Sequence, residues 1–160
     1  MWEQIWQKWK RWLVRKLVAD THLVFLHGRR SGTAVQLEFA TTIDAPVFIE
    51  TQIVHYLVRL ITRVSFRTPS GGWTEPERAL IDTGSPVSVI PHSIWQNVAH
   101  SFLTGETVID IAGMTISGRL GLVTLRLWDG QTVSPPLRVK ANLVWADNLP
   151  LILGFSDVLT

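Results

Sequence analysis

The stretch ERALIDTGSPVSVIPHSIW, residues 77–95, carries the most specific pattern in the chain. The apolar run 79–81 predicts a buried strand, and this strand delivers Asp82 into a tight turn at 83–84. Mostly apolar residues resume after the turn, over 87–90. The pattern therefore predicts a carboxylate held at the end of a buried strand.

The Asp-Thr-Gly motif alone is weak evidence of a functional site. Average residue usage produces Asp, then Thr or Ser, then Gly by chance in roughly one chain in ten or twenty of this length. An ordinary β-turn is then the simplest interpretation. A second pattern changes this balance, because the apolar residues 151–153 end in Gly154 about 70 residues downstream of the motif.

Together the two segments resemble the signatures of retropepsin-like aspartic proteases. The first signature is a short apolar run, Asp-Thr-Gly-Ser, two variable positions and Ser-Val-Ile-Pro; the second is an apolar run that ends in Gly before a short helix. The resemblance covers roughly residues 57–160 and is close at 79–95 and at 149–159. It implies an all-β fold, a small closed acid-protease barrel with one or two short helices.

The resemblance also implies an aspartic endopeptidase with Asp82 as the catalytic residue. Two carboxylates a few ångströms apart cannot both ionise easily, so one keeps a proton while the other acts as a base, and aspartic proteases are the familiar example of this split. The chain has one Asp-Thr-Gly and is short for two lobes, so the second carboxylate has to come from Asp82 of another copy. The prediction is a homodimer that cleaves a peptide or protein substrate without a cofactor.

The resemblance gives supporting roles to the next three residues of the active-site loop. The Thr83 hydroxyl would form a hydrogen bond across the dimer axis, and Gly84 would leave room for the substrate and the partner carboxylate. The Ser85 hydroxyl could bond the outer carboxylate oxygen.

A substrate flap is a further implication, and TVIDIAGMTISGRLGLVTLRL, residues 107–127, offers two strands around 113–118. Glycines at a hairpin tip permit opening and closing over a peptide. The residues expected at this tip are Gly113, Met114, Thr115 and Ile116. Gly105 is an alternative position for the tip, and an ordinary hairpin of the barrel is the alternative role for the whole segment.

Two features depart from the retroviral members of the family. Phe155 and Ser156 separate Gly154 from Asp157, where the family often has an Arg followed by Asp or Asn that ties the dimer. The chain also stops at Thr160, without an obvious C-terminal strand to interleave with its partner's. A non-catalytic retropepsin-like module that binds a peptide or dimerises is therefore the alternative function.

Short segments rich in β-branched and aromatic residues, separated by turn signals, support an all-β domain that we place at 31–160. The expected strand segments are AVQLEF, APVFIETQIV, LITRVSFRT, ERALID, TVIDIAG, LGLVTLRLW and QTVSPPLRVKANLVW. Residues 49–64 fit a helix or two strands, and we favour a strand from about Leu57. The best helix candidate of the domain is 92–101.

Residues 1–30 form a separate basic segment, with seven Lys or Arg against two acidic residues, while the rest of the chain has eight against eleven. The basic pI therefore reflects this segment, and we expect no nucleic-acid partner. Helical spacing over 2–18 gathers tryptophans on one face, and turn residues at 27–32 form a linker. Three roles remain open: packing on the barrel or the second subunit, attachment of residues 1–20 to an anionic membrane surface, and binding of a partner.

Several classes of site and location are excluded by composition. The chain has no cysteine, so it has no disulfide and no thiolate nucleophile, and its five histidines lack zinc-like spacing, so we expect no metal. No stretch of 18 uncharged apolar residues exists, so we predict no transmembrane helix and no signal peptide. The expected location is cytoplasmic, with the membrane surface as an additional place of attachment.

Overall fold

The fold is known from a computed structural model, which describes residues 23–27, 34–111 and 114–158. The helix expected over 2–18 lies outside these residues. Strands dominate the described chain, and its helices have seven residues or fewer. The prediction of an all-β fold with a few short helices is confirmed at this level. The elements in chain order are β1 (Leu23–His27), β2 (Ala34–Ile43), α2 (Ala45–Thr51), β3 (Tyr56–Phe66), β4 (Glu77–Asp82), β5 (Ser88–Ile90), α3 (His92–Trp95), β6 (His100–Phe102), β7 (Thr107–Ile111), β8 (Met114–Trp128), β9 (Leu137–Val144), β10 (Ile152–Gly154) and α4 (Phe155–Val158).

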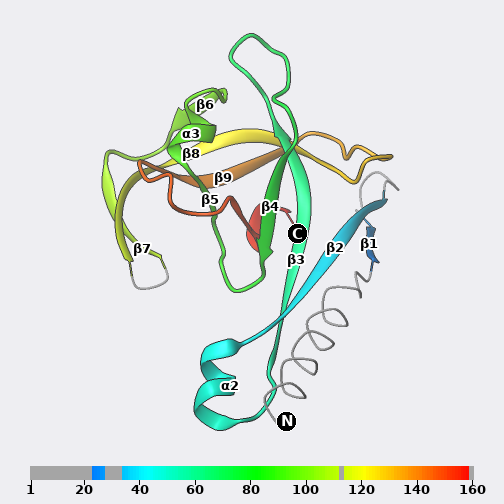
Figure 1. Ribbon diagram of the computed structural model, residues 1–160. Coiled ribbons are helices and arrows are strands. Elements are labelled where there is room, and N and C mark those ends of the chain that lie inside the picture. The colour runs from blue at the N-terminus through cyan, green and yellow to red at the C-terminus, as the bar shows by residue number, and fades with distance from the viewer. Residues whose placement is uncertain (1–22, 28–33, 112–113, 159–160) are drawn as a thin grey trace.

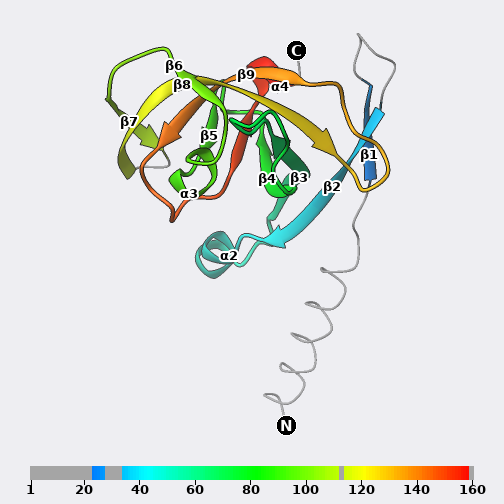
Figure 2. The same ribbon diagram turned by 90° about the horizontal axis from the view of Figure 1, so that it is seen from above.

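The strands join into one sheet in the order β1-β2-β3-β4-β10-β5-β9-β8-β6, and β7 pairs with β8 (Figure 1). An additional pairing joins the end of β8 back to β3, from Arg63↔Trp128 to Phe66↔Leu125. The strands β3, β4, β10, β5, β9 and β8 thus follow one another in a closed circuit of hydrogen-bonded neighbours. The view from above shows these strands curving around a common centre (Figure 2).

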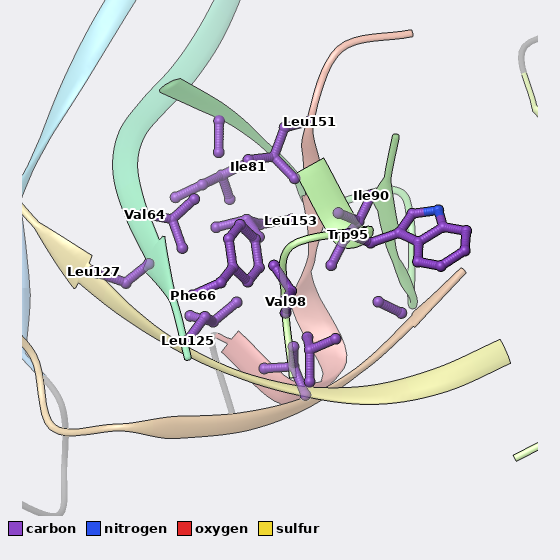
Figure 3. Packing of buried hydrophobic residues seen from close by; sticks show 14 of the residues in the cluster. Val64, Phe66, Ile81, Ile90, Trp95, Val98, Leu125, Leu127, Leu151 and Leu153 are labelled. Atoms are coloured by element: carbon purple, nitrogen blue, oxygen red, sulfur yellow. The ribbon is translucent and has the colours of Figure 1, made fainter. Parts of the chain in front are cut away.

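The hydrophobic core lies inside this circuit. Successive side chains of a strand point to opposite faces, so from Gly121 to Leu127 every second residue of β8 is buried while its neighbours are partly exposed. Side chains from several strands meet around Phe66, which is completely buried (Figure 3). Leu151 and Leu153, on either side of the start of β10, belong to the same cluster. The second apolar signature of the sequence is therefore part of the core.

Residues 45–51 form α2, so the prediction of a strand over APVFIETQIV was wrong for this part. The Asp44 side chain accepts a hydrogen bond from Val47 N at 3.2 Å and caps the helix, whose first turn contains a proline. Gln52 ends the helix with a left-handed φ of 58°. Capping and a proline in the first turn outweigh the β-branched content of a short segment. Strand β3 then begins at Tyr56, which confirms the strand expected from about Leu57.

The helix predicted over 92–101 is shorter than expected. Helix α3 ends at Trp95, and residues 100–102 form β6, which pairs with β8. Ala99 N donates to Arg67 O at 2.7 Å, so this backbone group is used by a distant strand end and not by a helix. Trp95 in the helix and Val98 after it are both buried.

Residues 23–27, which the sequence placed between the helix and the domain, form β1 and pair antiparallel with β2. This pairing attaches the end of the basic segment to the sheet edge. No helix of the described residues is long and apolar enough to cross a membrane.

Candidate active site

The turn after β4 holds Asp82, as the strand pattern predicted. Ala79 and Ile81 point into the core, and the alternation of β4 leaves Asp82 exposed at the strand end. The Oδ1 atom of Asp82 accepts a hydrogen bond from Gly84 N at 2.9 Å, and Ser85 N donates to Asp82 O at 3.3 Å. The first bond holds the carboxylate against its own turn and the second closes the turn backbone, with Thr83 and Gly84 exposed beside the carboxylate.

The second signature lies directly beside this turn. Strand β10 is inserted between β4 and β5, parallel to β4 and antiparallel to β5, and Gly154 is the register partner of Asp82. Phe155 N donates to Ser85 O at 2.9 Å. Two segments about 70 residues apart in the sequence are thus joined at the carboxylate.

Gly154 is a glycine because the turn approaches its backbone closely. A Cβ atom at this position would lie 2.6 Å from the carbonyl carbon of Val87 and 2.8 Å from Ser85 O. Both are backbone atoms of the loop, which cannot swing aside as a side chain would. The close contact therefore couples the position of β10 to the shape of the Asp82 turn.

Ser88 was not among the predicted site residues, yet it holds the two segments together. Its side chain is 2% exposed, and its Oγ accepts a hydrogen bond from Gly154 N at 3.1 Å. Burial of a hydroxyl costs free energy unless it is hydrogen-bonded, so this bond fixes the register between the loop and β10. The Ser-Val-Ile-Pro part of the first signature contained this residue, but only the fold reveals its partner.

The expected role of Ser85 is corrected by the structure. Its hydroxyl donates to Val87 O at 2.8 Å and so bonds the loop backbone, where a bond to the outer carboxylate oxygen of Asp82 was expected. The reason is that a serine hydroxyl has a single donor hydrogen, and the bond to Val87 O uses it.

The segment expected to form a flap is a hairpin of β7 and the start of β8, paired from Thr107↔Gly118 to Ile111↔Met114. Gly113 falls between the last pair, Ile111 and Met114, and lies outside the described residues, whereas Gly105 precedes β7. Gly118 lies inside β8, packed against Leu143 and Val144, so the tip is narrower than the predicted range 113–118.

Of the predicted tip residues, Met114 opens β8 as the register partner of Ile111, and Thr115 donates from its hydroxyl to Asp110 Oδ1 at 2.9 Å, which clips the hairpin. Ile116 is half-buried. Strand β7 and the loop between β4 and β5 extend to the same side of the strand circuit (Figure 1).

An open groove of about 550 Å³ lies against this hairpin. It is lined by Thr115, Ile116, Ser117, Trp145, Ala146 and Asn148. Ile116 and Ala146 pack in one cluster with Ile152, the first residue of β10. The groove wall is therefore continuous with the strand that reaches Asp82.

The loop behind the groove is held by Asp147. Its Oδ1 accepts a hydrogen bond from Ser93 N at 2.6 Å at the start of α3. This bond, a side-chain bond from Ser93 and the positive field of His92 lower the pKa of Asp147. Trp145 contacts the buried Trp95 ring edge-on, with 4.7 Å between ring centroids, and this packing supports the groove wall.

Asp157 has a structural role where the family often has an interface ion pair. Its Oδ2 accepts a hydrogen bond from Lys140 N at 2.8 Å, which ties α4 to β9 within the same chain. Within the described residues, no group of three or more His, Asp or Glu side chains could hold a metal ion. A scan against models of known protein families finds no matching family, and a search of curated proteins finds no match.

Proposed function

We propose that this chain is a retropepsin-like aspartic endopeptidase that works as a homodimer, with one Asp82 from each copy. The observation that carries the proposal is the pairing of Gly154 with Asp82, because it brings both sequence signatures together at the carboxylate. The closed circuit of six strands around the core supports the finer assignment of the fold to a retropepsin-like barrel.

The proposed reaction uses the two carboxylates in different protonation states. The ionised Asp82 takes a proton from a water molecule, and the resulting hydroxide adds to the carbonyl carbon of the peptide bond. The protonated Asp82 of the other copy donates its proton to the carbonyl oxygen. The tetrahedral intermediate then collapses: the carboxyl that took the proton from water gives it to the nitrogen, one hydroxyl of the intermediate returns its proton to the other Asp82, and the C–N bond breaks. No cofactor takes part in these steps.

The groove between the β7–β8 hairpin and the Trp145 loop supports a peptide substrate. Its lining is partly apolar and partly polar, as in sites that bind side chains and backbone together. Exposure of Asp82 at the surface of a single chain also supports dimerisation, because the second carboxylate has to approach from outside.

A peptide-library cleavage assay at mildly acidic pH tests this function, with Asp82→Asn as the matched variant. The amide keeps the shape of the side chain but cannot act as the base, so we expect cleavage to fall to background while the circular dichroism spectrum and the melting temperature stay close to wild type. Cleavage by Asp82→Asn at near wild-type rate would contradict the assignment. A wild-type chain that dimerises and binds peptides without cutting them would favour the non-catalytic module instead.

The place of action stays a prediction from the sequence. We propose that the protein acts in the cytoplasm, with residues 1–20 able to contact an anionic membrane surface.

A further inference from the structure

Strand β3 continues past the end of β4. Their last paired residues are Leu60 and Ile81, so Arg59 lies at the level of Asp82, the final residue of β4. Farther out, Tyr56–Arg59 pair with β2 and with no other strand of the described residues. Among the described residues, the edge of β3 that β4 occupies is therefore unpaired from Arg59 outward, beginning about 4.8 Å, one strand spacing, from the position of Asp82.

This open edge belongs to an arm, which we define as residues 40–59: the end of β2, α2 and the start of β3. Figure 1 shows the arm extending past the loop between β4 and β5, with α2 at its far end. Its two strands are paired from Ala40↔Arg59 to Ile43↔Tyr56. Asp44 N also donates to His55 O at 2.9 Å, which closes the base of the helix. The arm is thus an ordered element.

The arm exposes an unusual amount of apolar surface. Six of the twelve large hydrophobic side chains that are exposed in the described chain lie in it, between positions 49 and 58. They are Ile49 (73% exposed), Ile53 (60%), Val54 (42%), Tyr56 (55%), Leu57 (41%) and Val58 (59%). Single exposed apolar residues are normal, but six of them within ten positions of one element indicate an interaction surface.

We propose that the arm packs against a second copy of this chain and that this contact brings the two Asp82 carboxylates together. The inference rests on the proposed function, because it assumes that the two Asp82 residues meet. In a two-fold dimer every surface beside the axis faces the partner, and the open edge of β3 begins at the level of Asp82. This edge therefore has to lie within reach of the second copy.

The chemistry of the arm suits this occupant. An unpaired strand edge can add a strand from another chain through main-chain hydrogen bonds. Removing isoleucine, valine, leucine and tyrosine side chains from water lowers the free energy of the complex. Arg59 provides a charged group at the rim of the contact, beside the turn. A self-complementary surface of this kind meets the same surface of the partner about the symmetry axis.

Cross-linking tests the contact in the full chain, which contains no cysteine. Val58→Cys places one thiol on the arm, and Val133→Cys places one at a valine that is also exposed (42%) but lies before β9. With a short bis-maleimide at low protein concentration, we expect most Val58→Cys chains to become covalent dimers and Val133→Cys chains to stay monomeric. Equal cross-linking of the two variants would overturn the proposal.

Sedimentation gives the second measurement. Val58→Glu places a charge in the contact and should raise the dimer dissociation constant at least tenfold, whereas Val133→Glu should leave it unchanged. Peptide cleavage by Val58→Glu should fall with the dimer fraction and return at high protein concentration. Should Val58→Glu fail to fold, as judged by circular dichroism, the cross-linking result decides.

These measurements separate the inference from the proposed function. Wild-type cleavage together with unchanged dimerisation of Val58→Glu overturns the arm contact and leaves the protease assignment intact. Arm-dependent dimers that never cleave peptides support the contact and remove the protease assignment. A wild-type chain that cleaves peptides as a monomer also overturns the contact. An arm variant that stays dimeric but no longer binds vesicles overturns it too, because the arm would then contact membranes.

Discussion

Gly154 is paired with Asp82 across two parallel strands, and no other residue type fits there without moving the loop. The backbone of Val87 occupies the space that a Cβ atom would take, at 2.6 Å. A substitution far from the carboxylate in sequence therefore acts on the carboxylate directly.

Gly154→Ala should destabilise the fold by about 3 kcal/mol, the upper end of the usual cost of overpacking, because the added methyl overlaps backbone atoms that cannot rotate away. Gly105→Ala is the control, since nothing lies within 4 Å of its added Cβ, and its effect should stay within about 0.5 kcal/mol. Chemical denaturation of both variants measures the difference. Equal stabilities would mean that the loop and β10 are not in close contact.

Ser88→Ala should leave Gly154 N buried without an acceptor. We expect a loss of about 1–3 kcal/mol in the free energy of unfolding, the usual penalty for an unsatisfied buried donor. Ser85→Ala removes the hydroxyl of a residue that is only half-buried, so it should lower the free energy of unfolding by less than Ser88→Ala does. Thermal melts of the two variants provide the comparison, and a larger loss for Ser85→Ala would contradict this assignment of the loop bonds.

Asp129 should make stability depend on acid pH. Burial alone would raise the pKa of Asp129, but hydrogen bonds from the backbone N–H groups of Gln36, Thr132 and Gln131 outweigh burial and lower it. Because the pKa of Asp129 in the folded chain lies below the ordinary value of 3.8, the stabilisation of the fold by this carboxylate is complete at pH values above 3.8. It is lost as the pH falls through the lower folded pKa.

Asp129→Asn should therefore lower the melting temperature at neutral pH and flatten its decline between about pH 5 and pH 2. The Asp129 carboxylate joins the start of the β8–β9 loop to Gln36 of β2, at 2.9 Å from Oδ2 to the backbone nitrogen. Asp110→Asn is the control, since that carboxylate accepts from the Thr115 hydroxyl at an exposed position. An identical pH dependence for wild type and Asp129→Asn would refute the role of this carboxylate.

The activity of the proposed dimer should be greatest on the acid side of neutrality and fall on both sides of the maximum. Only the pair with one proton can supply a base and an acid at once. Initial rates between pH 3 and pH 9 on one cleaved peptide measure the profile. A rate that climbs steadily to pH 9 would indicate a different mechanism.

Residues 1–20 should bind vesicles that contain anionic lipid. Their predicted helix has tryptophans on one face and basic residues elsewhere, and each basic side chain near an anionic surface contributes on the order of 1 kcal/mol. Charge reversal at four basic positions should therefore release the full chain from the vesicles, as should high salt. The positions are Lys8, Lys10, Arg11 and Arg15.

Tryptophan fluorescence in the presence of vesicles gives the readout, with Arg138→Glu in the strand domain as the control. A blue shift that persists in Arg138→Glu and disappears after charge reversal supports the membrane contact. Fluorescence that does not change when vesicles are added would indicate that the tryptophan face packs against protein.

The sequence by itself determined the strand that ends at Asp82, the turn that follows it and the all-β character of the domain. These features depend on neighbouring residues: alternating burial along a strand, glycine in a tight turn and β-branched side chains. The same local reasoning failed over 45–51, where capping by Asp44 stabilises a helix in place of the predicted strand. It also failed over 92–101, where the pairing of β6 with β8 makes the helix shorter than predicted.

Only the tertiary structure decided what surrounds Asp82. The insertion of β10 between β4 and β5, the bond from Gly154 N to Ser88, and the open edge of β3 from Arg59 outward all join residues that are distant along the chain. Such contacts depend on how the whole sheet closes, because the side-chain pattern of a strand specifies which face is buried but not which strand lies beside it.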